Sequence, residues 1–394
     1  YSQYGGYGFR ILFEQRPINV LFYNSNSFSQ LKANVDSGGI LNIFSDFKGV
    51  KLFEEKLWGF KDLSSVFFIF GTILSIILGF RTFFPIRNIR FLSEFIHLKS
   101  VFLYKFISRL LLLLGLILFY FFFSLFIYQL NDLNITMIEM KFILLYFAIL
   151  ISVLLFFFFS GIMASLIRSY TLGITLIIFL WFLLQFILPG IINSVTSIKA
   201  DKLMSVYDLE LKKIKILMDF ERKSIEKAGI SKQEKNNTTT EREIVERYFK
   251  HEFVQLQALE KKLEREIEDN VQLYHLLSSF FPSTFYLSCG NEISSCGYHS
   301  FLDFYRYVQQ MKRKFLRFYI EKKFYSNFPR REMDLNSKKK VFFKVESFVK
   351  SDENIFFPKP SLPGHFLMGI LILYLYDLLI FLLSYFRFKN ILKK

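Results

Sequence analysis

The sequence predicts an all-α integral membrane protein, with five transmembrane helices and a large helical domain outside the bilayer. Of the 394 residues, 52% are hydrophobic and 53 residues are phenylalanine. These apolar residues gather in blocks of about 20, the length that crosses a hydrocarbon core of about 30 Å. A long charged segment with helical periodicity separates the last two blocks, and it predicts a domain outside the membrane.

Five blocks have the length and composition of membrane spans. They cover residues 63–80, 106–128, 142–167, 170–192 and 366–386. Residues 63–192 are therefore expected to form a four-helix transmembrane region. Residues 363–394 are expected to hold the last span and a basic cytoplasmic tail.

Basic residues between the spans predict the orientation, because short basic connections stay in the cytoplasm. The connection after the first span contains Arg81, Arg87, Arg90, Lys99, Lys105 and Arg109. The C-terminal tail is also basic, so residues 1–62 and 193–362 share the outer side. Residues 1–62 are then an extracytoplasmic loop, and a cytoplasmic N-terminus requires one more span before Tyr1, six in all.

The net charge of +16 fits the same class of protein. Basic residues beside membrane spans contact anionic lipid headgroups. No zinc-finger spacing, RNA-binding motif or helix-turn-helix pattern accompanies the charge, so a nucleic acid is not expected as a partner.

The outer segment contains two long amphipathic stretches, 204–228 and 241–277, joined by the polar residues 231–240. Such an arrangement predicts an antiparallel helical hairpin. The apolar stripe of the first stretch is Tyr207, Leu211, Ile214, Met218 and Ile225. The stripe of the second is Leu256, Leu259, Leu263, Ile267, Val271 and Tyr274. The stripes either pack on each other, as in a coiled coil, or the tip of the hairpin also docks a partner.

A third helix is predicted at about 300–325, where aromatic and basic residues suit the headgroup zone of a membrane. Just before it stand Cys289 and Cys296, the two cysteines of the chain. On an oxidising face they could close a small disulfide loop, or they remain as two thiols. Two ligands are too few for a metal site.

The sequence predicts no catalytic, cofactor-binding or metal-binding residues. It lacks a Walker loop, a zinc-protease helix and a nucleophile elbow. The histidines are scattered and are expected at surfaces or interfaces rather than as ligands. They are His97, His251, His275, His299 and His365.

Two side chains inside predicted spans, those of Asp377 and Gln185, are candidates for a special role. Asp377 is costly to bury in lipid, so it should face protein, water or a partner helix. It either makes a structural contact, for example at a dimer seam, or lies on a substrate path. Gln185, with Pro189 nearby, either packs between helices or lines a cavity.

The connection 85–105 has apolar residues at helical spacing and is basic. It either lies in the membrane interface as an amphipathic helix or docks a cytoplasmic motor subunit. Its periodicity alone is compatible with both.

Two stretches of sequence carry a family resemblance. Tyr4-Gly5-Gly6-Tyr7-Gly8-Phe9-Arg10, followed by Pro17 and residues 31–49, resembles an outer loop after a first span. Phe281-Pro282-Ser283 through Tyr305 resembles the return of an outer domain after its helical hairpin. With the order of the spans, these stretches resemble the permease subunit of an ABC-2 type ABC transporter, truncated before its first span. The bacterial subgroup with a large periplasmic domain before the last span is the most similar.

The resemblance implies a multi-pass permease of the bacterial inner membrane that hydrolyses no ATP itself. It also implies that the permease exports its substrate, as members of this family usually do. Two permease chains would form a homo- or heterodimer, and a cytoplasmic ATPase subunit would dock under each. The residues that dock the ATPase subunit would be Ile89, Leu92, Glu94, Phe95, Lys99 and Lys105. Lys105 matches a lysine that the family has in this loop. The Gly-Thr-Leu run that is usual in the family is absent here. The outer hairpin would meet a periplasmic protein. The alternative is a membrane-anchored scaffold or sensor whose hairpin binds such a partner; an intramembrane enzyme lacks a catalytic pair.

Overall fold

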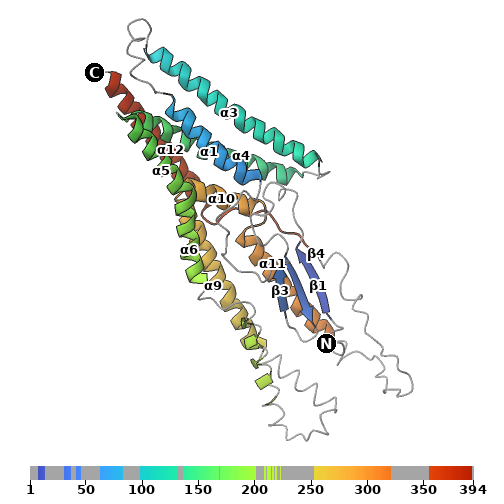
Figure 1. Cartoon of the computed structure of the whole chain (residues 1–394). Helices are drawn as coiled ribbons and strands as arrows, with labels where there is room; N and C mark the ends of the chain where they lie inside the picture. Colours follow the sequence, from blue (N-terminus) through green and yellow to red (C-terminus); the bar gives the residue numbers. More distant parts are fainter. Residues whose placement is uncertain are drawn as a thin grey trace, which may run out of the picture.

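The computed structural model describes most of the helical parts of the chain. The described residues are 8–13, 31–36, 41–45, 63–82, 98–130, 136–167, 169–200, single positions between 208 and 222, 253–320 and 355–392. The molecule is elongated, with a bundle of apolar helices at one end and a domain of helices and a small sheet at the other (Figure 1).

The prediction of a helical membrane protein is confirmed. Among the described residues, five helical segments are long and apolar enough to cross a membrane. They are Leu63–Phe80, Leu103–Leu130, Met137–Ser165, Tyr170–Lys199 and Phe366–Arg387. They belong to helices α1 (Leu63–Phe80), α3 (Leu98–Leu130), α4 (Met137–Ser165), the α5–α6 segment, and α12 (Phe366–Leu392).

Helix α4 is the centre of the bundle, and α1 packs most closely against it. At Gly79 of α1, an added Cβ would lie 2.0 Å from the carbonyl oxygen of Phe158. At Gly161 of α4, it would lie 2.4 Å from the carbonyl oxygen of Ile76. Small residues of this kind let two membrane helices approach backbone to backbone. Helices α3 and α12 are covered far less by the rest of the chain, so most of their surface faces lipid or a partner.

The fourth span is one long rod of three helical pieces. Helix α5 (Tyr170–Phe182) passes into a π-helical turn, η3 (Leu183–Ile187), and then into α6 (Leu188–Ala200). Pro189 has no backbone N–H and would crowd the carbonyl four residues earlier in a regular helix. The wider π turn just before it relieves this conflict, as π turns do at helix irregularities.

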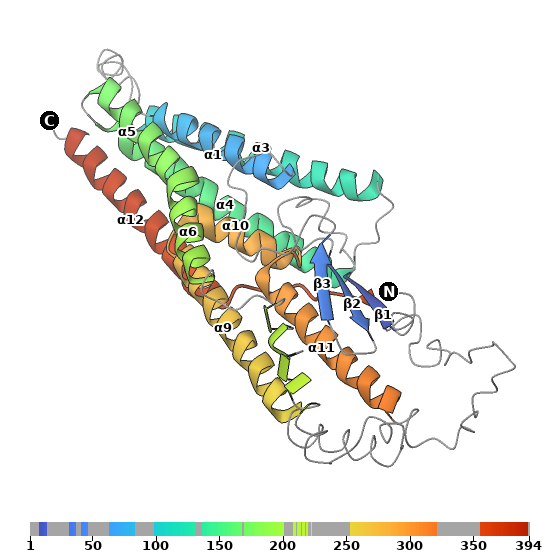
Figure 2. The ribbon, with the colours of Figure 1, turned by 60° about the horizontal axis from the view of Figure 1, so that its bottom comes forward.

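The outer domain is built on α9 (Phe253–Ser279), α10 (Pro282–Ile293) and α11 (Tyr298–Ile320). A sheet of order β3-β2-β1-β4 lies beside them, as the view from below shows (Figure 2). Its strands are β1 (Gly8–Phe13), β2 (Leu31–Asp36), β3 (Leu41–Ser45) and β4 (Ile355–Phe356). The first three pair antiparallel, and β4 pairs parallel with β1. Residues 1–62, predicted as a loop, therefore also contribute three strands.

The stripe of the second predicted hairpin helix is confirmed, because Leu263, Ile267, Val271 and Tyr274 of α9 are buried in the core of the outer domain. The stripe of the first is wrong where it is described: Leu211 and Met218 are exposed. Leu209 and Lys213 face inward instead. Lys213 pairs with Glu260 of α9, so a buried ion pair selects the face that apolar periodicity alone missed. Tyr207, Ile214, Ile225 and residues 231–240 lie outside the described residues.

Helix α11 is also placed differently from the prediction. Several of its aromatic side chains pack into the core of the outer domain, where the prediction had them suited to a headgroup zone. The buried ones are Tyr298, Phe301, Phe304, Tyr305 and Phe315. One of its basic residues, Arg306, contacts the acids Glu264 and Glu268 of α9.

Candidate functional site

Helix α10 joins the two halves of the molecule. Phe285, Tyr286, Cys289 and Ile293 pack into the core of the membrane bundle. Tyr286 is hydrogen-bonded through its hydroxyl to Ser64 of α1 and to Tyr146 of α4. The last turn of the same helix carries Glu292, which points away from the bundle into the outer domain. Any chemistry at Glu292 is therefore tied mechanically to both halves.

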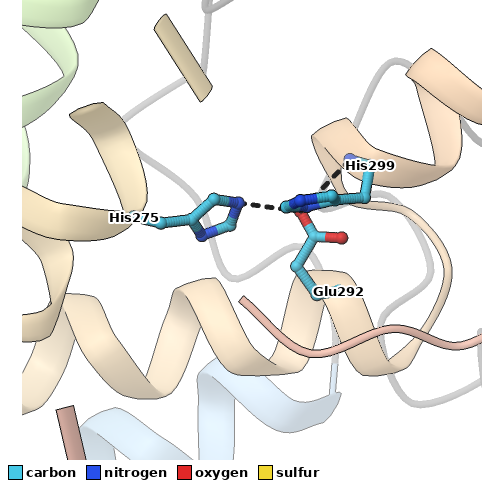
Figure 3. Close-up of side chains that lie close together, drawn as sticks. All are labelled: His275, Glu292 and His299. Atoms are coloured by element: carbon cyan, nitrogen blue, oxygen red, sulfur yellow. Dashed lines mark hydrogen bonds and ion pairs between the residues drawn. The ribbon is translucent and has the colours of Figure 1, made fainter. Parts of the chain in front are cut away.

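Three side chains from three helices converge at Glu292. His275 comes from α9 and His299 from the first turn of α11. His275 Nε2 lies 3.2 Å and His299 Nδ1 lies 3.3 Å from Glu292 Oε1. Figure 3 shows both imidazole rings turned toward this one carboxylate. We call these residues the His–Glu–His cluster. One nitrogen from each histidine and one carboxylate oxygen of Glu292 all lie within 4.8 Å of one another, close enough to hold a metal ion.

The turn after α10 brings His299 back over the carboxylate. Ser295 has a φ of 60°. Its N–H donates to the carbonyl of Glu292, and the N–H of Cys296 donates to the carbonyl of Asn291, both at 3.0 Å. This is a Schellman ending of the helix. Next comes Gly297, where an added Cβ would lie 2.3–2.6 Å from the Glu292 carboxylate, so only glycine leaves room for the acid.

Neighbouring groups fix the cluster from outside. Ser288 Oγ lies 2.9 Å from Nδ1 of His275 and orients that ring. Ser361, in the segment leading to α12, donates from Oγ to Glu292 Oε2 at 3.0 Å and from its N–H to the Glu292 carbonyl at 3.4 Å. The cluster therefore holds together α9, α10, α11 and the chain just before the last span.

The cluster strongly favours positive charge beside the carboxylate. Burial by itself raises the pKa of the Glu292 carboxyl, but the contacts of His275 and His299 outweigh burial and hold that pKa well below its usual range. The contact with Glu292 raises the pKa of the His299 imidazole above its ordinary value, although burial opposes this. The carboxylate is thus ionised in the interior of the domain and attracts a cation, either a proton on imidazole or a metal ion.

Sequence reasoning missed this site. His275, expected at a surface or interface, is buried in the outer domain, and His299 is partly covered. The two histidines and Glu292 come from separate helices, so no regular spacing marks them. The one local signal is the short segment from Glu292 to His299, in which an acid, a glycine and a histidine flank a helix end.

The predicted ATPase-docking residues are placed only in part. Ile89, Leu92, Glu94 and Phe95 lie outside the described residues. Lys99 and Lys105 fall in the first turns of α3, at the end of the bundle that Arg81 also marks. Their role in docking stays a prediction.

Gln185 makes a structural contact rather than lining a cavity. The π-helical turn carries its side chain inward, where Nε2 donates to Thr72 Oγ1 of α1 at 2.9 Å. Trp181 Nε1 donates to the same oxygen at 3.1 Å. This polar contact ties the fourth span to the first in the interior of the bundle.

Asp377 lies on the half-covered face of α12, one turn from the buried Leu373. Its Oδ1 is shielded and has no hydrogen-bond partner among the described residues. The predicted need for a protein, water or partner-helix contact therefore stands, with no partner assigned.

Of the two alternatives for the cysteines, a disulfide or two thiols, the structure has two thiols. Cys289 and Cys296 are both buried thiols. Cys289 sits within α10 and packs into the bundle core, whereas Cys296 lies in the turn beyond the helix end. Burial, with the nearby Glu292 charge, raises the pKa of the Cys289 thiol.

Comparison with known proteins gives no relative. No protein-family model, no curated protein and no solved structure matches the chain.

Proposed function

We propose that the chain is the permease subunit of an ATP-driven exporter in a bacterial inner membrane, coupled to a separate ATPase subunit. The observation that carries the proposal is the continuity between the membrane bundle and the outer domain. A motor on the opposite side of the membrane requires such a rigid connection, because it must move the outer domain through the spans.

Two elements provide this connection. The last piece of the fourth span, α6, reaches the outer domain, because its Ile192 packs in the core of that domain. Helix α10 packs against α1, α4 and α12. Its contact with α12 is close, because a Cβ added at Gly369 would lie 2.3 Å from the Phe285 ring. A tilt of either span would therefore displace the outer domain as well.

The exposed surfaces of the bundle supply room for partners. Helices α3 and α12 expose large apolar side chains along most of their length, including Leu111, Phe119, Leu371 and Leu379. In the proposed assembly, lipid covers part of this surface and a second permease chain covers the rest. The ATPase subunit would contact residues 85–105 on the cytoplasmic side.

A membrane-anchored scaffold or sensor is the second candidate. It is favoured by the size of the outer domain, whose α9 and α11 are joined by several ion pairs and an extensive core. In that case the domain would bind an outer partner and no motor would be required.

Co-purification separates the two. The full chain, tagged and extracted from native membranes, is expected to bring down a subunit that hydrolyses ATP. The double substitution Leu92→Asp and Phe95→Asp should abolish its recovery, whereas Lys261→Glu on the outer domain should not. If no ATPase is recovered with the unsubstituted chain, or if the double variant retains it, the permease proposal fails.

A further inference from the structure

We propose that the His–Glu–His cluster is a metal site for a divalent transition-metal ion, with Zn²⁺ the best match to its donors. Two imidazole nitrogens and one carboxylate oxygen are a ligand set that zinc takes in proteins. The inference is independent of the transport proposal, because it rests only on the geometry at the end of α10.

The distances fit a metal between the ligands. For metal bonds of about 2.0–2.1 Å, neighbouring ligand atoms of a tetrahedron lie about 3.3–3.4 Å apart. The two nitrogen–oxygen distances in the cluster are 3.2 and 3.3 Å. The three donor atoms all lie within 4.8 Å of one another, so a cation between them could contact all three side chains after small adjustments.

The hydrogen-bond geometry argues against a simple network. Although His275 Nε2 and His299 Nδ1 both lie near Glu292 Oε1, neither nitrogen has a hydrogen-bond partner among the described residues. His275 is only 2% exposed, so its Nε2, which lies 3.2 Å from Glu292 Oε1, has no bulk water to contact.

The outer contact of His275 leads to the same conclusion. When Nδ1–H donates to Ser288 Oγ, Nε2 presents a lone pair toward the carboxylate. Two electron-rich atoms then face each other in a buried place, and a cation between them removes the repulsion. Histidine ligands of zinc are held in this way, with the second ring nitrogen donating to a neighbouring group.

His299 provides the route of entry. Its side chain is 33% exposed, whereas those of His275 and Glu292 are 1% exposed each. With three protein ligands, a tetrahedral ion keeps one position for water, and the His299 side is where water can reach it. The bound ion would fasten α9, α10 and α11 at the point where the outer domain meets the bundle.

The test is a metal measurement on the full chain. The protein is purified in detergent with a histidine-free tag and without chelator, and its metal content is determined by mass spectrometry. The protein is then freed of metal with a chelator, the chelator is removed, and the protein is titrated with Zn²⁺, with Fe²⁺ and Mn²⁺ as competitors. We expect one Zn²⁺ per chain, and a rise in the unfolding temperature when Zn²⁺ is restored.

Three variants make the test specific. Removing a group that hydrogen-bonds to a metal ligand typically lowers metal affinity by about 10- to 100-fold. Ser288→Ala, which removes the hydroxyl beside His275, should therefore weaken Zn²⁺ binding by about tenfold. His299→Gln removes a ligand itself and should weaken Zn²⁺ binding by more than about tenfold. His365→Gln, a histidine outside the cluster, should bind Zn²⁺ like the unsubstituted chain. Because the His299 side chain is partly exposed, its variant should fold, unlike a substitution of the fully buried Glu292.

Two results would overturn the site. One is a chain that neither retains nor takes up Zn²⁺ and whose unfolding temperature does not change when metal is added. The cluster would then be only an ion pair between protonated histidine and Glu292. The other is Zn²⁺ binding that His299→Gln and Ser288→Ala leave unchanged, which would put the metal elsewhere.

Discussion

Asn270 on α9 donates a hydrogen bond from Nδ2 to the carbonyl oxygen of Thr196 on α6, at 3.1 Å. Both residues are fully buried. The bond links the outer domain to α6, the last helical piece of the fourth span.

Asn270→Ala should therefore loosen this junction. Loss of one intramolecular hydrogen bond costs about 0.5–1.5 kcal/mol. Amide hydrogen exchange of the full chain in detergent should speed up in residues 192–200 of the variant. The exposed Gln272→Ala is the control and should exchange like the unsubstituted chain; equal exchange in both variants would remove Asn270 from the junction.

Acid should weaken the packing of α9 against its neighbours. Burial raises the pKa of Glu260, but Lys213, Lys312 and Arg313 lower it more, so it lies below its ordinary value of 4.5. The stabilisation is therefore complete above that value and is lost as the pH falls through the lowered pKa. Glu260→Gln leaves Lys213 buried without its acid and should cost about 3 kcal/mol at neutral pH. Its difference from the unsubstituted chain, followed by hydrogen exchange of α9, should shrink as the solution becomes acidic; a constant difference would contradict this account.

The contact of α1 with α4 should not tolerate a larger residue at Gly161. Its Cβ position meets the backbone at Ile76 and Phe80, which cannot rotate away. Gly161→Ala should lower the stability of the bundle by about 3 kcal/mol, the upper part of the range for overpacked cores. Gly115→Ala on α3, where nothing lies within 4 Å, is the matched control. Thermal unfolding followed by tryptophan fluorescence compares them, and equal midpoints would show that the helices are not in backbone contact.

The two cysteines should be hidden rather than bridged. In the folded chain at pH 8, buried thiols should react slowly with a maleimide, and slowest at Cys289, whose raised pKa keeps it protonated. After denaturation without reductant, both should be labelled at once, as intact mass spectrometry can count. Labelling that appears only after reduction would instead reveal a disulfide.

The predicted orientation can be checked with single cysteines in a chain that lacks the native pair. Tyr104→Cys at the start of α3 and Lys261→Cys on α9 both replace exposed residues. An impermeant maleimide added to intact cells should label the second and spare the first. Labelling of both from outside would reverse or abolish the assigned topology.

The spans could be predicted because lipid imposes a simple rule. Each backbone group must be paired within its own helix, so an apolar block of sufficient length is enough to define the element. The stripe from Leu263 to Tyr274 was equally clear, since one face of a long helix lies on a core. The first hairpin helix was harder because a buried ion pair, Lys213 with Glu260, decides its inward face.

The sheet and the cluster depend on partners distant in sequence. Strand β1 pairs with β4, and neither shows a local pattern that names the other. His275, Glu292 and His299 likewise acquire meaning only when three helices bring them together. A histidine with no regular spacing to other ligands looks the same in sequence whether it ends on a surface or in a site.

The parallel pairing of β1 with β4 and the Ser361 contact with Glu292 also set an order for biosynthesis. Both contacts use residues made just before the final span leaves the ribosome. Until then, the first strand has one unpaired edge and the buried acid lacks one of its donors. The outer domain can therefore be completed only when the last helix is about to be made, and a nascent chain arrested earlier leaves a strand edge open to pairing with other chains.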